Sequence, residues 1–184
     1  LPKRNHLSED CLSRFNHSTI KQYLISIDDG NNLLVKNGSL LNILSYLLEV
    51  NGCSLREAER CYSVFTVIEN TNKINNLTND IFKIAMGFVA FLKVHNPQVL
   101  SDIIFKRYGI EEIFLKLSIN KSHMRVIPEL PLLNHLLQYH FTSDEQLKNP
   151  DTKKLYENIE SFFGMRVPLL ENMCETVEGF EISY

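Results

Sequence analysis

A chain of 184 residues with 44% hydrophobic and 22% charged residues has the composition of an ordinary globular protein. Only 7 glycines and 6 prolines leave few positions for the tight turns of an all-β fold, so the composition favours helices. The net charge of −3 excludes binding to nucleic acid or to an anionic membrane through the field of the whole chain, and such binding would need a local basic patch.

The cysteines favour a reduced, intracellular protein. Cys11, Cys53, Cys61 and Cys174 show neither C-x-x-C spacing nor a nearby histidine cluster, which argues against a zinc site. Nothing at the amino end resembles a signal peptide, so we expect partly buried thiols in a cytosolic protein. Because the sequence begins at Leu1 without a methionine, we also expect a fragment of a larger protein.

The first third of the chain predicts helices separated by short turns. Apolar residues recur at helical spacing over residues 6–16 and 20–27. The carboxylates of residues 28–32 do not alternate as a calcium loop requires, so a turn is predicted there. Residues 39–50 are too apolar for a surface helix and too short to cross a bilayer, so they predict a buried helix that stops at Asn51 and Gly52.

The next helix has the best-defined start in the chain. Ser54 and Glu57 have the spacing of a capping box, in which each side chain accepts a hydrogen bond from the other residue's amide. At about 100° per residue, the apolar positions from 55 to 68 fall on one stripe, whereas Arg56, Arg60 and Ser63 fall on the opposite side. Glu59 beside Arg56 and Glu57 beside Arg60 can offset the repulsion of the two arginines, so this face can simply be solvated.

The second half of the chain continues the helical pattern. Residues 70–77 predict a loop, after which Thr78 or Asn79 caps an apolar helix over residues 81–94. This run is too short to span a membrane, and Gly87 within it predicts close approach of a neighbouring helix. Pro97 opens the next helix, and another follows Gly109. A loop without regular structure is expected over residues 118–131, and helices over residues 132–141, 153–163 and 168–174.

No recognisable catalytic or cofactor motif occurs in the chain. Phosphate-binding, dinucleotide-binding, zinc-protease and nucleophile-elbow motifs are all absent. His135 and His140 are five residues apart, which is the wrong spacing for two metal ligands on one helical face. The most basic stretch contains Lys116, Lys121, His123 and Arg125, but it lacks the interleaved aromatic residues typical of a nucleic-acid surface.

Two segments carry a resemblance to a known family. The sequence SLREAER at residues 54–60, preceded by a hydrophobic helix, resembles the "sLREaER" segment in the helical region that follows the nucleotide-binding core of KAP-family P-loop NTPases. The sequence FLKVHNPQVL at residues 91–100 resembles the "lLKxxNPelY" segment that comes next in that family. Their order and spacing agree with the family, although together they cover only a small part of the chain.

This resemblance implies the C-terminal helical lid of an ATPase of the STAND or AAA-like type, a kind of protein often membrane-associated and, in bacteria, often linked to phage exclusion. ATP and Mg²⁺ are then cofactors of the intact protein and not of this chain, which lacks the Walker motifs. The implied partner is a P-loop domain upstream in the same polypeptide, in the cytoplasm or at the inner face of a membrane. Arg56 is the first candidate for sensing the γ-phosphate and Arg60 the second, whereas a solvated or interdomain face shared with Glu57 and Glu59 is the favoured alternative for both.

Two other functions stay open from the sequence. A stand-alone helical module that binds a partner protein needs no catalytic site. A helix-turn-helix DNA-binding protein, with residues 54–64 as recognition helix, is disfavoured because Glu57 and Glu59 would repel phosphates.

We therefore predict an all-α fold, an irregular bundle of about eight to ten helices. It forms one domain over residues 1–184, with a division into a lid-like part (1–76) and an accessory part (77–184) as the alternative. The residues expected in its core are Ile43, Leu47, Leu55, Tyr62, Phe65, Ile84, Phe88, Phe91 and Leu92.

Overall fold

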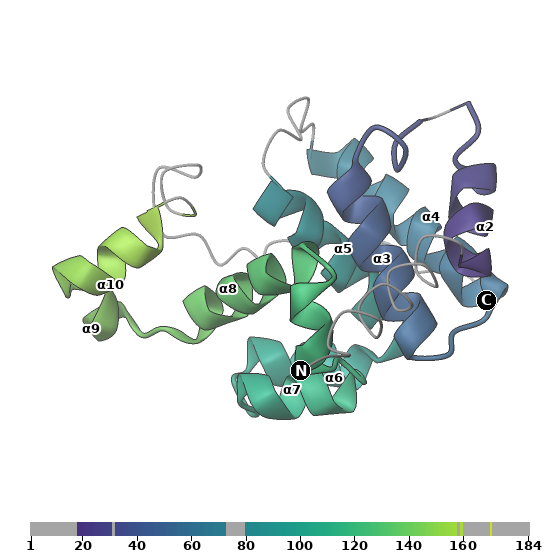
Figure 1. Cartoon of the computed structure of the whole chain (residues 1–184). Coiled ribbons are helices and arrows are strands. Elements are labelled where there is room, and N and C mark those ends of the chain that lie inside the picture. The colour runs from purple at the N-terminus through teal and green to yellow at the C-terminus, as the bar shows by residue number, and fades with distance from the viewer. Residues whose placement is uncertain (1–17, 31, 73–79, 158, 160–169, 171–184) are drawn as a thin grey trace, which may run out of the picture.

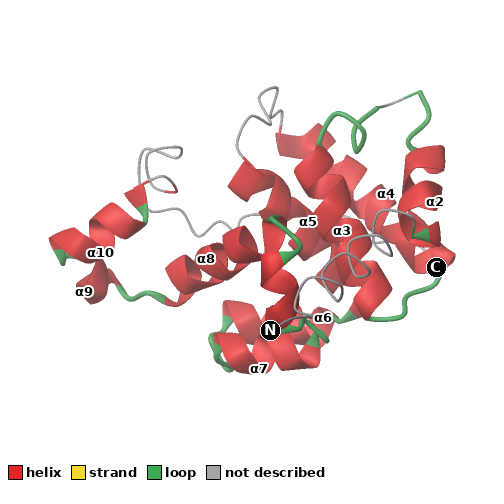
Figure 2. Cartoon of the chain, viewed as in Figure 1, coloured by secondary structure: helices red, strands yellow, loops and turns green. Residues whose placement is uncertain are grey.

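A computed structural model describes residues 18–30, 32–72, 80–157, 159 and 170. All regular structure in these ranges is helical, as Figure 2 shows, which confirms the predicted all-α bundle. The helices predicted over residues 6–16 and 168–174, and the caps predicted at Thr78 and Asn79, lie outside the described ranges apart from residue 170. The division at residues 76 and 77 stays a prediction.

Helices α2 (Thr19–Ile27), α3 (Gly38–Val50), α4 (Leu55–Asn72) and α5 (Asp80–His95) pack together and form what we call the body of the molecule (Figure 1). Helix α5 is its centre, because both α3 and α4 pack against it and every residue from Ile84 to Leu92 is buried. A helix that is apolar on all sides must be covered on all sides, so the apolar run predicted as a helix over residues 81–94 lies at the centre of the fold. The buried helix predicted over residues 39–50 is α3, which also has most of its residues buried. Within the described residues, no helix is long and apolar enough to cross a membrane.

Gly87 lets helices α3 and α5 approach closely, as its position in the apolar run predicted. A Cβ atom at this position would lie 2.8 Å from Cδ1 of Leu40 and 3.0 Å from Cγ2 of Ile43. A side chain at this position would therefore force the packed side chains of Leu40 and Ile43 to shift.

The loop between α2 and α3 is organised by Asp28, which is only 1% exposed. Its carboxylate accepts hydrogen bonds from the amides of Leu33, Leu34 and Val35, at 2.9, 2.8 and 3.0 Å, and from the Tyr62 hydroxyl at 3.0 Å. Since the carboxylate faces inward and is used by the protein itself, Asp28 belongs to a turn, as predicted, and is not placed to bind calcium.

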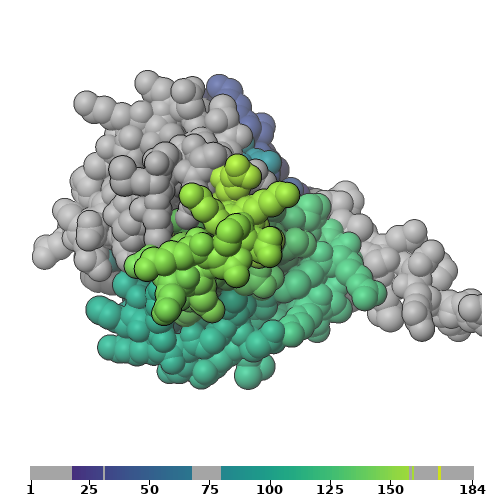
Figure 3. Space-filling model, turned by 90° about the vertical axis from the view of Figure 1, so that its left-hand side faces the viewer, coloured from purple at the N-terminus to yellow at the C-terminus, as the bar shows by residue number. Residues whose placement is uncertain are grey.

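The remaining helices extend the body on one side. Helices α6 (Pro97–Ile104), α7 (Ile110–Lys116) and α8 (Glu129–Phe141) follow, with Pro97 in the first turn of α6 as predicted. After α8, residues 142–157 form a C-terminal arm that contains α9 (Asp144–Leu147) and α10 (Pro150–Leu155). Figure 3, in which the left-hand side of Figure 1 faces the viewer, shows this yellow-green arm in front of α8.

Several predicted boundaries are wrong. A short 3₁₀ helix, Lys121–Arg125, interrupts the segment expected to be irregular, and α8 begins inside it at Glu129 because a proline at position 131 is tolerated in a first helical turn. Helix α4 continues through Asn72 into the predicted loop, α9 was not predicted, and α10 begins at Pro150 instead of residue 153.

Eight of the nine expected core residues are buried, and Leu55 is not. Leu55 is 40% exposed, although it lies on the apolar stripe of α4. It is the first residue of that helix, and helical side chains lean toward the N-terminus, so its side chain extends past the end of the core.

Candidate functional site at the start of helix α4

The start of α4 is fixed by its backbone and its cap. Gly52 has a φ of +63°, a left-handed conformation that ends α3 as predicted and turns the chain toward α4. The Ser54 amide donates to Oε2 of Glu57 at 2.8 Å, and the Glu57 amide donates to Oγ of Ser54 at 3.3 Å. Both hydrogen bonds of the predicted capping box are therefore present, and they hold the first turn of the helix in place.

The two candidate arginines lie on this helix in different environments. Arg56 is exposed, and among the described residues it has no hydrogen-bond or ion-pair partner. Arg60, one turn further, is half-buried. The outward position of Arg56 agrees with its place opposite the apolar stripe.

Three side chains with metal-binding or acid–base chemistry converge beside the cap. The thiol Sγ of Cys53 lies 3.3 Å from Nδ1 of His95, and Oε1 of Glu57 lies 3.2 Å from the same nitrogen. His95 is the last residue of α5, and its ring stacks on Phe91 with centroids 5.1 Å apart. Because α5 runs antiparallel to α4, its end returns to the point where α4 begins.

The protonation of this cluster follows from its surroundings. Burial, with a smaller contribution from the Glu57 charge, raises the pKa of the Cys53 thiol to about 12. Hydrogen bonding from the Ser54 amide, its largest cause, lowers the pKa of Glu57. At neutral pH the cluster thus contains a thiol and a carboxylate, so Cys53 is not activated as a nucleophile. Moreover, the thiol and the carboxylate approach the same ring nitrogen, whereas a nucleophile–base–carboxylate relay uses both nitrogens of the histidine.

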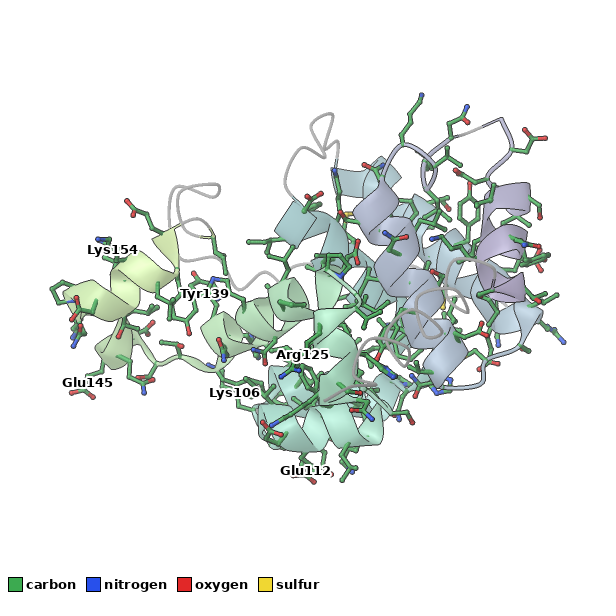
Figure 4. All side chains as sticks on the ribbon, viewed as in Figure 1. Lys106, Glu112, Arg125, Tyr139, Glu145 and Lys154 are labelled. Carbon is green, nitrogen blue, oxygen red and sulfur yellow. The ribbon has the colours of Figure 1, made fainter. Side chains whose placement is uncertain are left out.

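The other residues considered from the sequence have structural contacts. The ring of His135 packs on Tyr156, and Nε2 of His140 lies 2.9 Å from the carbonyl oxygen of Ile103. In the basic stretch, Lys116 lies over the ring of Tyr108 and Lys121 is paired with Glu111 at 2.7 Å. Arg125, in the same stretch, is exposed on the side of α6 and α7 (Figure 4).

Sequence reasoning did not find the cluster of Cys53, Glu57 and His95, which we call the CEH cluster. The cysteine and the histidine are 42 residues apart, so no spacing motif connects them. The available signal was topological, because two consecutive antiparallel helices bring the end of the second to the start of the first.

Comparison with protein-family models, with curated proteins and with solved structures finds no match for this chain. The resemblance to KAP-family NTPases therefore stays a prediction.

Proposed function

We propose that this chain is the helical lid and accessory region of a KAP-type P-loop ATPase and that Arg56 senses the nucleotide held by the P-loop domain. The sequence support is the resemblance of residues 54–60 and 91–100 to the two segments of that family. The observation that carries the proposal is the position of Arg56, which is exposed on the first turn of a helix whose start is fixed by a complete capping box.

The proposed chemistry requires an exposed arginine on a rigid support. A guanidinium that meets the γ-phosphate forms charge-assisted hydrogen bonds, and these strengthen as negative charge develops in the transition state. Loss of the γ-phosphate on hydrolysis removes this contact, so the position of the lid follows the state of the nucleotide. In this scheme ATP and Mg²⁺ bind to the P-loop domain, and the protein acts in the cytoplasm or at the inner face of a membrane, with phage exclusion as the implied role.

The test uses the protein together with its P-loop domain. We expect Arg56→Ala to slow ATP hydrolysis by about tenfold or more without unfolding the protein, since Arg56 makes no core contact. Arg56→Lys should restore only part of the rate, because an ammonium group lacks the planar fork of a guanidinium. Arg125→Ala is the matched control, because it removes the same charge from an exposed position away from α4 and should leave turnover unchanged.

The chain by itself should neither hydrolyse ATP nor bind it with micromolar affinity, because it has no phosphate-binding loop. Saturable binding in a calorimetric titration would contradict this expectation and would point to a different nucleotide site.

A helical module that binds a partner protein is the second candidate function. The observation that favours it is the exposure of Phe105 and Leu115, 66% and 80% respectively, in the region of α6 and α7. If Arg56→Ala and Arg60→Ala both leave turnover unchanged in the intact protein, the lid proposal is wrong and this module becomes the better explanation.

A further inference from the structure

The CEH cluster has the spacing of a metal site. In tetrahedral zinc sites the metal lies about 2.3 Å from sulfur and about 2.0–2.1 Å from nitrogen, so ligand atoms lie roughly 3.3–3.6 Å apart. The distances from Nδ1 of His95 are 3.3 Å to Sγ of Cys53 and 3.2 Å to Oε1 of Glu57, and all three ligand atoms lie within 4.8 Å of one another. Both distances from Nδ1 agree with this spacing, and the thiol sulfur and the carboxylate oxygen would have to come within about 3.6 Å of each other for one ion to contact all three atoms.

Two of the three side chains, Glu57 and His95, are held in position by groups that would not compete for the ion. Oε2 of Glu57 accepts the hydrogen bonds of the capping box, which leaves Oε1 directed at the cluster. The ring of His95 is fixed by stacking on Phe91. A ligand set whose members are already oriented loses little conformational freedom when it binds an ion.

We propose that Cys53, Glu57 and His95 form a binding site for one divalent transition-metal ion of the zinc class, with water as the fourth ligand. A thiolate, an imidazole and a carboxylate together favour zinc or cobalt, whereas calcium and magnesium prefer sites made of oxygen atoms. The side chains of His95 and Glu57 are 26% and 32% exposed, so the cluster is open to solvent on one side, where water can complete a tetrahedron.

Binding would form a metal–sulfur bond in place of the S–H bond of Cys53, and the released proton would pass to solvent. The ion would connect the α3–α4 loop, the first turn of α4 and the last residue of α5, so it would brace the helix start that carries Arg56. The proposal concerns this chain alone and does not depend on the proposed ATPase function.

The experiment titrates the purified chain with Co²⁺, whose thiolate charge-transfer and tetrahedral ligand-field absorption report its ligands. Cys11 and Cys174 are first replaced by serine, so that neither can supply a thiolate. We expect one Co²⁺ per chain with both absorption features, displacement by Zn²⁺, and a higher thermal midpoint when Zn²⁺ is bound.

Variants then test each ligand. Cys53→Ala should abolish the charge-transfer band, and His95→Gln should weaken binding by more than about tenfold. Glu57→Gln should weaken it similarly while the helix start stays intact, because glutamine also completes a capping box. Cys61→Ala removes the other buried thiol among the described residues, which lies on α4, and should leave the charge-transfer band in place.

Circular dichroism without metal establishes that each variant is folded. The proposal is overturned if the folded parent chain shows no charge-transfer band at millimolar Co²⁺, because the cluster would then be a hydrogen-bonded group only. It is also overturned if the band survives Cys53→Ala or disappears in Cys61→Ala.

Discussion

The body of the molecule and its C-terminal arm differ in how they are held. The body buries large side chains completely, including Tyr46, Phe65, Phe88 and Phe91, within one continuous apolar core. Neither α9 nor α10 contains a buried residue, and the arm is attached through a separate small cluster of Tyr139, Tyr156 and Ile159. Figure 4 shows Tyr139 where α8 faces the arm.

The two regions therefore illustrate two ways of fixing a helix. Helices of the body are fixed by apolar surface removed from water, which stabilises by about 25 cal/mol per Å². Among the described residues, helices of the arm are held by their own caps, such as the capping box between Ser143 and Gln146, by a few aromatic contacts, and by Leu147, which packs against the small cluster. The start of α4 belongs to the body, which suits a site that must keep its geometry.

The largest expected effect is the loss of a central aromatic ring from the body. Phe88 is fully buried on α5, so Phe88→Ala should lower the free energy of unfolding by about 3–5 kcal/mol, measured by urea denaturation. A loss below about 1 kcal/mol would show that α5 is peripheral and would remove the contrast between body and arm.

The second-largest loss of stability is expected from removing the buried carboxylate of Asp28 in the body. Asp28→Ala leaves three amides and the Tyr62 hydroxyl without their acceptor, so we expect a loss of about 2–4 kcal/mol in the same measurement. Asp29→Ala is the matched control, because this neighbouring carboxylate is exposed and its removal should cost less than about 0.5 kcal/mol. Equal effects of the two substitutions would show that the loop does not depend on the buried carboxylate.

These residues also show what the sequence could predict. The capping box of Ser54 and Glu57, the helix stop at Gly52 and the close approach at Gly87 were predictable, because each depends on residues near in sequence or on the size of one side chain. The buried face of α5 followed from its uninterrupted apolar run. Arg56 could be assigned to an exposed face from helical periodicity alone.

The rest depended on tertiary contacts that no local pattern encodes. Asp28 accepts three hydrogen bonds from amides of its own loop, but its fourth comes from Tyr62, which is 34 residues away. The CEH cluster exists only because α4 and α5 are antiparallel. The exposure of Leu55 depends on where the core ends and not on helical phase. The short helix α9 is different, because a single turn shows no period but its capping box of Ser143 and Gln146 was a local signal that sequence reasoning missed.

Removal of an aromatic ring from the arm should have a smaller, local effect. Tyr156 packs on His135 and Tyr139, with ring centroids 5.1 and 5.4 Å away. Tyr156→Ala should release α9 and α10, which would appear as faster hydrogen exchange and proteolysis over residues 144–155. Global unfolding should change by less than about 1 kcal/mol, because the core of the body is untouched. A global loss comparable to that of Phe88→Ala would show that the arm and the body unfold as one unit.

The smallest expected effect is the response of each region to acid. Burial lowers the pKa of His135, which contacts the arm, and of His123, whose Nδ1 lies 2.9 Å from the Tyr46 hydroxyl of the body. Below about pH 6.5, the ordinary histidine pKa, the unfolded chain therefore binds more protons than the folded one. The contribution of each histidine is fully present above that pH and is lost as the pH falls toward its lowered folded value.

The contributions of the two histidines can be distinguished by the region of the molecule that loses stability in acid. Between pH 7 and pH 5, the hydrogen-exchange protection factors of residues 144–155, which are corrected for the intrinsic slowing of exchange in acid, should fall. His135→Gln should remove this fall because glutamine does not titrate. His123→Gln should leave the arm unchanged and should instead reduce the pH dependence of the global unfolding midpoint. If His135→Gln instead changes the global unfolding midpoint and His123→Gln changes the arm, His135 stabilises the body and not the arm. If the response of the arm to acid survives His135→Gln, other titrating groups cause it. Either result would show that the ring contact between His135 and Tyr156 does not control attachment of the arm.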